Sequence, residues 1–175
     1  MNVTELEKCI ELYGKDIYAF CRQLTYSRQE AEELYQDTFL KAMELLQKIN
    51  ASENPKSYLL SIALRNWKNH KKKYACRKRI ADMESLSEEM EDAEKAGSYS
   101  LEEEVLAKEW ASEVQRAVRQ LDDKHRLPVY LYYMEELPLQ EIASVLKIPK
   151  GTVKSRLYQA RESLRNMLEV DEYER

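Results

Sequence analysis

The chain has 175 residues, of which 43% are apolar, 34% are charged, three are glycine and four are proline. So few helix breakers argue against sandwiches, barrels and glycine-rich nucleotide loops, and they predict an all-α protein. The net charge is −4, and three cysteines without a CxxC pair are accompanied by only two histidines, so we expect no metal, no cofactor and no disulfide framework. No stretch approaches the roughly 18 apolar residues of a membrane span, and the first ten residues do not resemble a secretory signal. We therefore expect a soluble, cytoplasmic protein without direct membrane insertion.

Two amphipathic helices are predicted in the first 50 residues. Apolar residues recur at spacings of three and four across residues 6–24 and again across residues 31–49, which places each set on one face of a helix. Ser27 and Glu30 have the spacing of a capping box at the start of the second helix. We expect the two apolar faces to pack together.

One part of the second helix departs from this pattern. Phe39 and Leu40 lie off the apolar stripe, and their neighbours Gln36, Asp37 and Lys41 are polar. Apolar groups on an otherwise polar face indicate either a surface for a partner or ordinary partial exposure. The residues alone leave both interpretations open.

A third helix is predicted after the turn signal Asn54-Pro55, and its continuation is strongly basic. Residues 56–79 contain nine lysines and arginines and no acidic residue. Cations neutralise phosphates, and aromatic rings stack on unpaired bases, so this mixture is typical of a surface for an opened DNA strand. The alternative is a solvated lysine face with Trp67 in the core. The residues that carry the DNA-binding interpretation are Tyr58, Arg65, Asn66, Trp67, Lys68 and Lys72.

An acidic segment, residues 82–103, separates this helix from the rest of the chain. It is rich in Asp, Glu and Ser and poor in apolar residues. Such a segment buries too little surface to offset the entropy of ordering it, so we expect a flexible linker. One interpretation is that it spans the distance between two domains and that its negative charge competes for their basic faces. The other is that it is simply a solvated loop. The predicted domains are therefore residues 1–81 and 104–175.

The second domain ends in a predicted helix-turn-helix. A stripe from Trp110 to Leu121 indicates one helix, and Leu127-Pro128 opens a short apolar segment. Residues 140–146 and 151–167 then form two helices joined by a tight turn, with Ala143 and Val153 at the crossing. Lys147 takes the turn position where glycine is common, so we expect a left-handed backbone there.

The outward residues of the last helix suit duplex DNA. Lysine, serine and glutamine side chains reach base edges in a major groove, whereas Thr152 and Arg156 are suited to phosphates. A plain helical hairpin is the alternative. The candidate DNA-contacting set is Lys150, Thr152, Lys154, Ser155, Arg156, Tyr158 and Gln159.

The chain resembles the sigma-70 family of bacterial transcription initiation factors, in particular the small extracytoplasmic-function group. Residues 30–42, EAEELYQDTFLKA, are similar to the family's second conserved region. Residues 58–81 resemble its promoter-melting segment, and residues 141–161, EIASVLKIPKGTVKSRLYQAR, resemble its fourth region. The resemblance covers nearly the whole chain and implies two helical domains around the acidic linker.

The resemblance also implies roles for individual residues. The surface of Gln36, Asp37, Phe39 and Lys41 corresponds to the family's dock for core RNA polymerase. The segment around Tyr58, Arg65, Asn66 and Trp67 would face the minus-ten element, and an asparagine that many relatives have at position 65 comes one residue later here, so either Arg65 or Asn66 reads the flipped base. Lys154, Ser155, Tyr158 and Gln159 match positions that read the minus-thirty-five element. An anti-sigma factor is an implied partner, and the free chain is expected to be a monomer.

This resemblance implies a sigma factor, not an enzyme, that directs promoter-specific transcription initiation in a stress or envelope response. A repressor or activator whose N-terminal half is a sensor or a dimerisation domain shares the helix-turn-helix but does not explain the basic third helix. A nuclease is not favoured, because the sequence shows no converging set of catalytic groups. A structural hub built on the acidic segment would leave both basic surfaces without a role.

Overall fold

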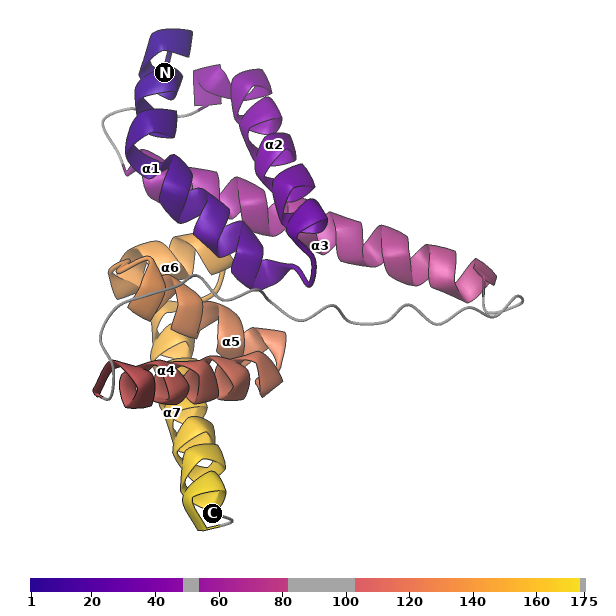
Figure 1. Cartoon of the computed structure of the whole chain (residues 1–175). Helices are drawn as coiled ribbons and strands as arrows, with labels where there is room; N and C mark the ends of the chain where they lie inside the picture. Colours follow the sequence, from indigo (N-terminus) through magenta and orange to yellow (C-terminus); the bar gives the residue numbers. More distant parts are fainter. Residues whose placement is uncertain (49–53, 82–102, 174–175) are drawn as a thin grey trace. The chain divides into compact units, whose positions relative to one another are not determined.

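Helices account for the regular secondary structure of the residues that the structure describes. This computed structural model describes residues 1–48, 54–81 and 103–173, with side chains for 1–48, 54–73 and 110–168. No strand occurs within these ranges (Figure 1), so the all-α class is confirmed. The chain divides into two compact units, Met1–Ala93 and Glu94–Arg175. The predicted linker, apart from Glu103 at the start of a helix, lies outside the described residues.

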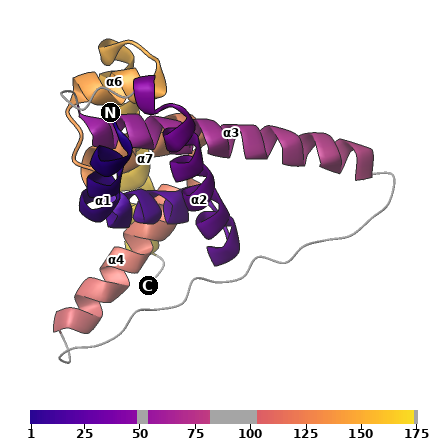
Figure 2. The ribbon, with the colours of Figure 1, turned by 90° about the horizontal axis from the view of Figure 1, so that it is seen from above.

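The first unit is built from three long helices. They are α1 (Val3–Leu24), α2 (Arg28–Glu44) and α3 (Pro55–Ala81), with a single 3₁₀ turn at Leu46–Lys48 after α2. Each of the three helices contacts the other two. The C-terminal half of α3 extends beyond α1 and α2, as both views of the ribbon show (Figures 1 and 2).

Side chains at the helix starts explain where α1 and α2 begin. Asn2 and Glu5 form a complete capping box, in which each side chain accepts a hydrogen bond of 2.8 Å from the other residue's backbone N–H. At α2, the Ser27 hydroxyl accepts from the Glu30 N–H at 3.1 Å, as the sequence predicts. The Glu30 carboxylate, however, accepts from the Tyr26 N–H, so only half of the expected box forms.

The core of the first unit comes from all three helices. Ile17, Phe20 and Leu34 are almost completely buried. Helix α3 buries several apolar side chains over its first four turns, because it packs against both α1 and α2. These residues are Leu59, Leu60, Ile62, Ala63, Leu64 and Trp67.

The second unit is organised around its last helix. It comprises α4 (Glu103–Gln120), α5 (Asp123–Val129), a π-helical turn (Tyr130–Met134), α6 (Leu139–Leu146) and α7 (Lys150–Tyr173). Helix α7 contacts α4, α5 and α6. The side chains at this centre are buried and include Ile142, Ala143, Val153, Leu157 and Ala160.

The helix α5 begins earlier than the sequence predicts. The Asp122 carboxylate caps it by accepting a hydrogen bond of 3.1 Å from the backbone N–H of His125. Pro128 therefore lies inside the helix and not in its first turn, so the expected start at Leu127 is wrong. Beyond this proline the turn widens, and the Glu135 N–H donates to the Tyr130 carbonyl, five residues back.

Trp110, expected on a buried stripe of α4, is 48% exposed.

The turn between α6 and α7 has the predicted left-handed backbone. Lys147 has φ 55° and ψ 46°. The Ile148 N–H donates to the Ala143 carbonyl at 3.0 Å and the Lys147 N–H donates to the Ser144 carbonyl at 3.3 Å, which together form a Schellman motif. The turn of the helix-turn-helix thus has a lysine in the left-handed conformation that glycine adopts with the least steric strain.

No described helix combines the length and the apolar character that crossing a bilayer requires.

Replacing Lys147 with glycine should raise the free energy of unfolding by up to about 1 kcal/mol, because glycine removes the steric cost of a left-handed backbone. Ser144→Gly, at an exposed position inside α6, should instead lower it by about 0.5–1 kcal/mol. Urea unfolding of the two variants measures both changes. A loss of stability in Lys147→Gly would contradict the strain that we assign to this turn.

Candidate nucleic-acid interface

The predicted surface on α2 does not form one continuous face. Phe39 is only 8% exposed, and its ring centroid lies 4.9 Å from that of Tyr35 in an edge-to-face contact. The expectation that Phe39 is available to a partner is therefore wrong. The reason is that α2 packs against both α1 and α3, so its buried face is broader than a single stripe and includes the flanking position four residues after Tyr35.

The exposed apolar groups of α2 are Leu40 and Met43. They are 60% and 53% exposed, and they follow the exposed Gln36 at spacings of four and seven residues. This spacing places the three side chains on one outer face of the helix. The sequence analysis included Leu40 but not Met43. Its position one helical turn after Leu40 could have indicated that Met43 lies on the same face.

The other two predicted residues of α2, Asp37 and Lys41, each lie beside a charged or titratable partner. The Asp37 carboxylate lies 3.1 Å from Nε2 of His70 on α3, so it links α2 to the basic helix. Lys41 forms an ion pair with Glu44 on its own helix. Both members of the Asp37–His70 contact are about half exposed, which keeps them within reach of a macromolecular partner.

Four of the predicted residues of α3 share one face. Tyr58, Arg65, Lys68 and Lys72 follow one another at spacings of seven, three and four residues, which is the spacing of one helical face. The three cations are exposed, whereas Tyr58 is half-buried. Asn66 is half-buried on the neighbouring side, so Arg65 is the more accessible of the two candidate base readers. This face is suited to the phosphates of a DNA strand.

Trp67 lies on the opposite side of α3. It is 6% exposed, and the Lys71 ammonium lies 4.6 Å from its ring centroid. The expectation that this ring is available for stacking on a base is therefore wrong, because the side chain fills the core against α1 and α2. The cation–π contact instead holds Lys71 against the edge of that core.

The predicted residues of α7 divide between two faces. Lys154, Ser155 and Tyr158 line an open hollow of about 670 Å³. Tyr132, from the π-helical turn, and Arg161 contribute to the same hollow, and neither was among the predicted site residues. Exposed Tyr158 and Lys154 bring an aromatic ring and a cation together on this face. The remaining lining residues are Leu139, Gly151 and Leu157.

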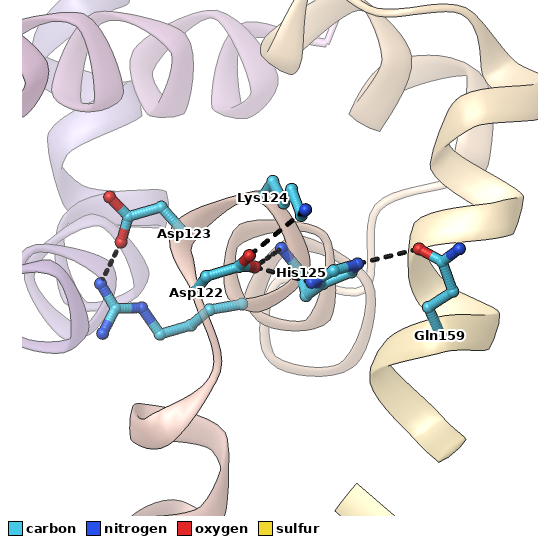
Figure 3. Close-up of polar contacts among 6 residues, drawn as sticks. Asp122, Asp123, Lys124, His125 and Gln159 are labelled. Carbon is cyan, nitrogen blue, oxygen red and sulfur yellow. Dashed lines mark hydrogen bonds and ion pairs between the residues drawn. The ribbon is translucent and has the colours of Figure 1, made fainter. Parts of the chain in front are cut away.

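Gln159 belongs to the other face of α7, together with half-buried Thr152 and Arg156. Its amide oxygen lies 2.9 Å from Nε2 of His125 on α5, and Nδ1 of the same ring lies 2.7 Å from the Asp122 carboxylate (Figure 3). Lys150 is exposed at the start of the helix. One predicted base reader is thus connected to a histidine that sequence reasoning missed, because 34 residues separate the two in the chain.

The cap of α5 is an ionised carboxylate. Desolvation by itself raises the pKa of Asp122, but hydrogen bonds from the His125 ring and backbone, with the nearby charges of His125 and Lys124, hold that pKa below its ordinary value. Because folding lowers this pKa, the ionised cap favours the folded state at neutral pH. That contribution is lost as the pH falls through the acidic range in which Asp122 takes up its proton.

Comparison with protein-family models gives two matches. The model described as Sigma-70 region 2 matches residues 9–76, and the model described as Sigma-70, region 4 matches residues 111–164. Together they cover about 70% of the chain and fall one on each unit.

Curated proteins similar to the chain carry consistent names. The ECF RNA polymerase sigma factor SigW of Bacillus subtilis (strain 168) is 29% identical over 163 residues, which span 91% of this chain and 86% of the relative. The RNA polymerase sigma-H factor of Pseudomonas aeruginosa is 29% identical over 163 residues, spanning 90% and 82%. The ECF RNA polymerase sigma-E factor of Escherichia coli (strain K12) is 26% identical over 144 residues, spanning 80% and 74%.

Two solved structures share the fold. One is the sigma factor RpoE of Bartonella quintana, crystallised with the anti-sigma factor NepR, which has a TM-score of 0.77, 22% identity and coverage of 97% of this chain and 99% of that one. The other is CnrH in complex with the cytosolic domain of CnrY, with a TM-score of 0.65, 18% identity and coverage of 94% and 88%.

Phe39→Ala should lower the free energy of unfolding by about 3–5 kcal/mol, because it empties a buried ring site beside Tyr35. Leu40→Ala, at the adjacent exposed position, should change it by no more than about 0.5 kcal/mol. Chemical unfolding of the two variants compares them directly. If Phe39→Ala were as stable as Leu40→Ala, the buried position of the Phe39 ring would be contradicted.

Proposed function

Since the chain belongs to the sigma-70 family of bacterial transcription initiation factors, we propose that it works as an extracytoplasmic-function sigma factor with its tasks divided between two units. It binds core RNA polymerase and directs promoter-specific, DNA-templated initiation, and it is not an enzyme. The observation that carries this function is the pair of sigma-70 matches, region 2 on the first unit and region 4 on the second. We assign residues 1–81 to core binding and the minus-ten element, 104–175 to the minus-thirty-five element, and 82–103 to the connection between them.

The outer face of α2 binds core polymerase in this proposal. Leu40 and Met43 supply exposed apolar surface, and Gln36 adds an amide on the same face. Burying such surface against a partner is favourable, at about 25 cal/mol for each Å² of apolar area. Asp37 and Lys41 form the charged edge of the dock. Phe39 supports this face from inside and does not itself contact the polymerase.

The exposed face of α3 engages the opened minus-ten strand. Arg65, Lys68 and Lys72 neutralise phosphates and release counterions, which gives affinity for any sequence. Tyr58 offers the ring on this face, and Arg65 or Asn66 reads the flipped base. The buried position of Trp67 supports a role in holding α3 to the core.

Helix α7 reads the minus-thirty-five duplex. Lys154, Ser155, Tyr158 and Gln159 face base edges, and Lys150, Thr152 and Arg156 fix the helix on the phosphates. The Schellman turn at Lys147 sets the angle at which α7 leaves α6. Two weak DNA-binding modules held by one polymerase gain affinity through their effective concentration, so the free chain should bind promoter DNA poorly.

We place the protein in the cytoplasm, as a monomer when free, and we include an anti-sigma factor among its partners in a stress or envelope response. The family resemblance supports this assignment, and one of the solved structures with this fold is a sigma factor in a co-crystal with an anti-sigma factor.

The deciding experiment is run-off transcription from a genomic promoter pool with purified core polymerase. Specific transcripts that need both the chain and the core enzyme support the proposal. A repressor or activator would bind DNA but would not replace the specificity subunit, so binding without initiation would identify that alternative.

Leu40→Ser should weaken binding to core polymerase about tenfold, because it removes an exposed apolar contact from the proposed dock. Leu12→Ser is the matched control, since Leu12 is 70% exposed on α1, outside that dock, and it should bind as the wild type does. Titration of fluorescently labelled chain with core enzyme measures both. Equal weakening by the two substitutions would count against the dock on α2.

Lys154→Ala should relax the base preference within the upstream element by about 1–3 kcal/mol, because a direct base contact is lost. Lys72→Ala should weaken transcription from all templates alike and reduce its salt dependence, because a phosphate contact is lost. Transcription from a panel of single-base promoter variants at two salt concentrations separates the two effects. A uniform loss on every template in both variants would remove base readout from Lys154.

A further inference from the structure

The His125 ring is held at both of its nitrogens, by groups from two helices. Nδ1 lies 2.7 Å from the Asp122 carboxylate, and Nε2 lies 2.9 Å from the amide oxygen of Gln159 (Figure 3). The side chain of His125 is only 18% exposed, whereas that of Asp122 is 55% exposed. The imidazole therefore lies as a bridge between the capped start of α5 and one face of α7.

The chemistry of the two partners defines where the protons are. An ionised carboxylate only accepts hydrogen bonds, so Nδ1 of His125 carries a proton and donates it to Asp122. The amide oxygen of Gln159 also accepts, so the contact at Nε2 requires a second proton on the ring. With the Gln159 amide in this orientation, the pairing needs a proton on both ring nitrogens. When Nε2 loses its proton it becomes an acceptor, and Gln159 must turn its amide to present the NH₂ group.

We propose that His125 is a positioning residue for promoter recognition, because its protonation state selects which end of the Gln159 amide faces DNA. This inference rests on the proposed function, in which Gln159 reads a base. With His125 charged, the oxygen of Gln159 is held by the ring and the NH₂ group points outward as a donor. With His125 neutral, one N–H of the amide is held by the ring and the oxygen is left outward as an acceptor.

The two states favour different bases. An outward NH₂ group pairs with the major-groove acceptors of guanine, thymine or adenine, whereas an outward oxygen pairs only with the amino group of cytosine or adenine. Histidine is the side chain that changes charge within the physiological pH range. One position of the upstream element should therefore change its preferred base with pH.

The charged surroundings of the ring are compatible with this switch. On α5, Lys124 lies 3.5 Å from Asp122, and Arg126 is paired with Asp123. Arg119 of α4 meets α5 through its carbonyl, which accepts from Arg126. The π-helical turn against α5 brings only tyrosines as titratable groups. On α7, Arg156 and Glu162 lie within one turn of Gln159, and Glu162 pairs with Arg165.

Asp122 remains the fixed partner of this arrangement. Desolvation by itself raises its pKa, but the hydrogen bonds from His125 hold that pKa below the ordinary value, so Asp122 is ionised at neutral pH. A permanent acceptor at Nδ1 means that the proton gained or lost is the one at Nε2, which faces Gln159.

The test uses the full chain with core polymerase and a template panel carrying each base pair at every position of the upstream element. Transcription is compared at about pH 5.5 and about pH 8.5, on either side of the histidine range. Preferences are ratios between templates at one pH, so the pH dependence of the polymerase itself cancels. We expect one position to change its preference about fivefold or more, towards G or T at low pH and towards C at high pH.

Variants separate positioning from general structure. His125→Phe keeps a ring but removes both hydrogen bonds, and it should abolish the pH-dependent change. Gln159→Ala should abolish it too, and adding His125→Phe to that variant should then leave the base profile unaltered. His70→Gln, which removes the other histidine of the chain, should retain the change. If His125→Phe does not fold, Asp122→Asn preserves a good cap while removing the negative charge beside Nδ1, and it should weaken the change.

A spectroscopic readout separates this inference from the proposed function. The side-chain amide signal of Gln159 in the free, ¹⁵N-labelled chain, assigned by its absence in Gln159→Ala, should shift with pH in the wild type and not in His125→Phe. If the chain fails to initiate transcription although this signal titrates, the proposed function is wrong and the hydrogen-bond switch stands. Transcription with a base preference independent of pH, or a Gln159 signal that does not titrate, overturns the role of His125.

Discussion

In both units a single helix must supply part of the hydrophobic core and most of a charged surface, and this double demand constrains the rest of the structure. Helix α3 buries Leu60, Leu64 and Trp67, while Arg65 and Lys68, each directly after one of these residues, remain exposed. Helix α7 buries Val153 and Leu157 in the same way. Since successive residues of a helix point about 100° apart, the core residues hold the helix and so orient the cations.

The cations of α3 repel one another, and this repulsion opposes folding. Lysines and arginines follow one another along α3 without an acidic residue from 56 to 79, and among the described side chains Asp16 of α1 pairs with Lys56 and Asp37 of α2 lies against His70. Helix α2 is therefore coupled to the basic helix through the Asp37–His70 contact, while its outer apolar face is directed elsewhere. In the proposed function, this arrangement places the polymerase-binding surface and the DNA-binding surface on adjacent helices of one small unit.

In the second unit, the helices before the helix-turn-helix contribute to the surface that it presents. The cap at Asp122 begins α5 early enough to bring His125 against Gln159. The wide turn after Pro128 carries Tyr132 to the hollow beside Lys154. Neither contact is visible in the sequence of α7 alone, although one of them holds the Gln159 side chain and the other shapes the surface beside Lys154.

The sequence by itself determined what depends on neighbours in the chain. Apolar periodicity predicted the helices, the run of lysines predicted the basic face, and the missing glycine at Lys147 predicted a left-handed residue in the turn, because each of these depends on a few adjacent positions. Only the tertiary structure decided that Phe39 and Trp67 are buried, that Leu40 and Met43 are exposed, and that His125 meets Gln159. Periodicity reveals which side of a helix is apolar, but the width of the buried face depends on how many other helices cover it, and those helices come from distant parts of the chain.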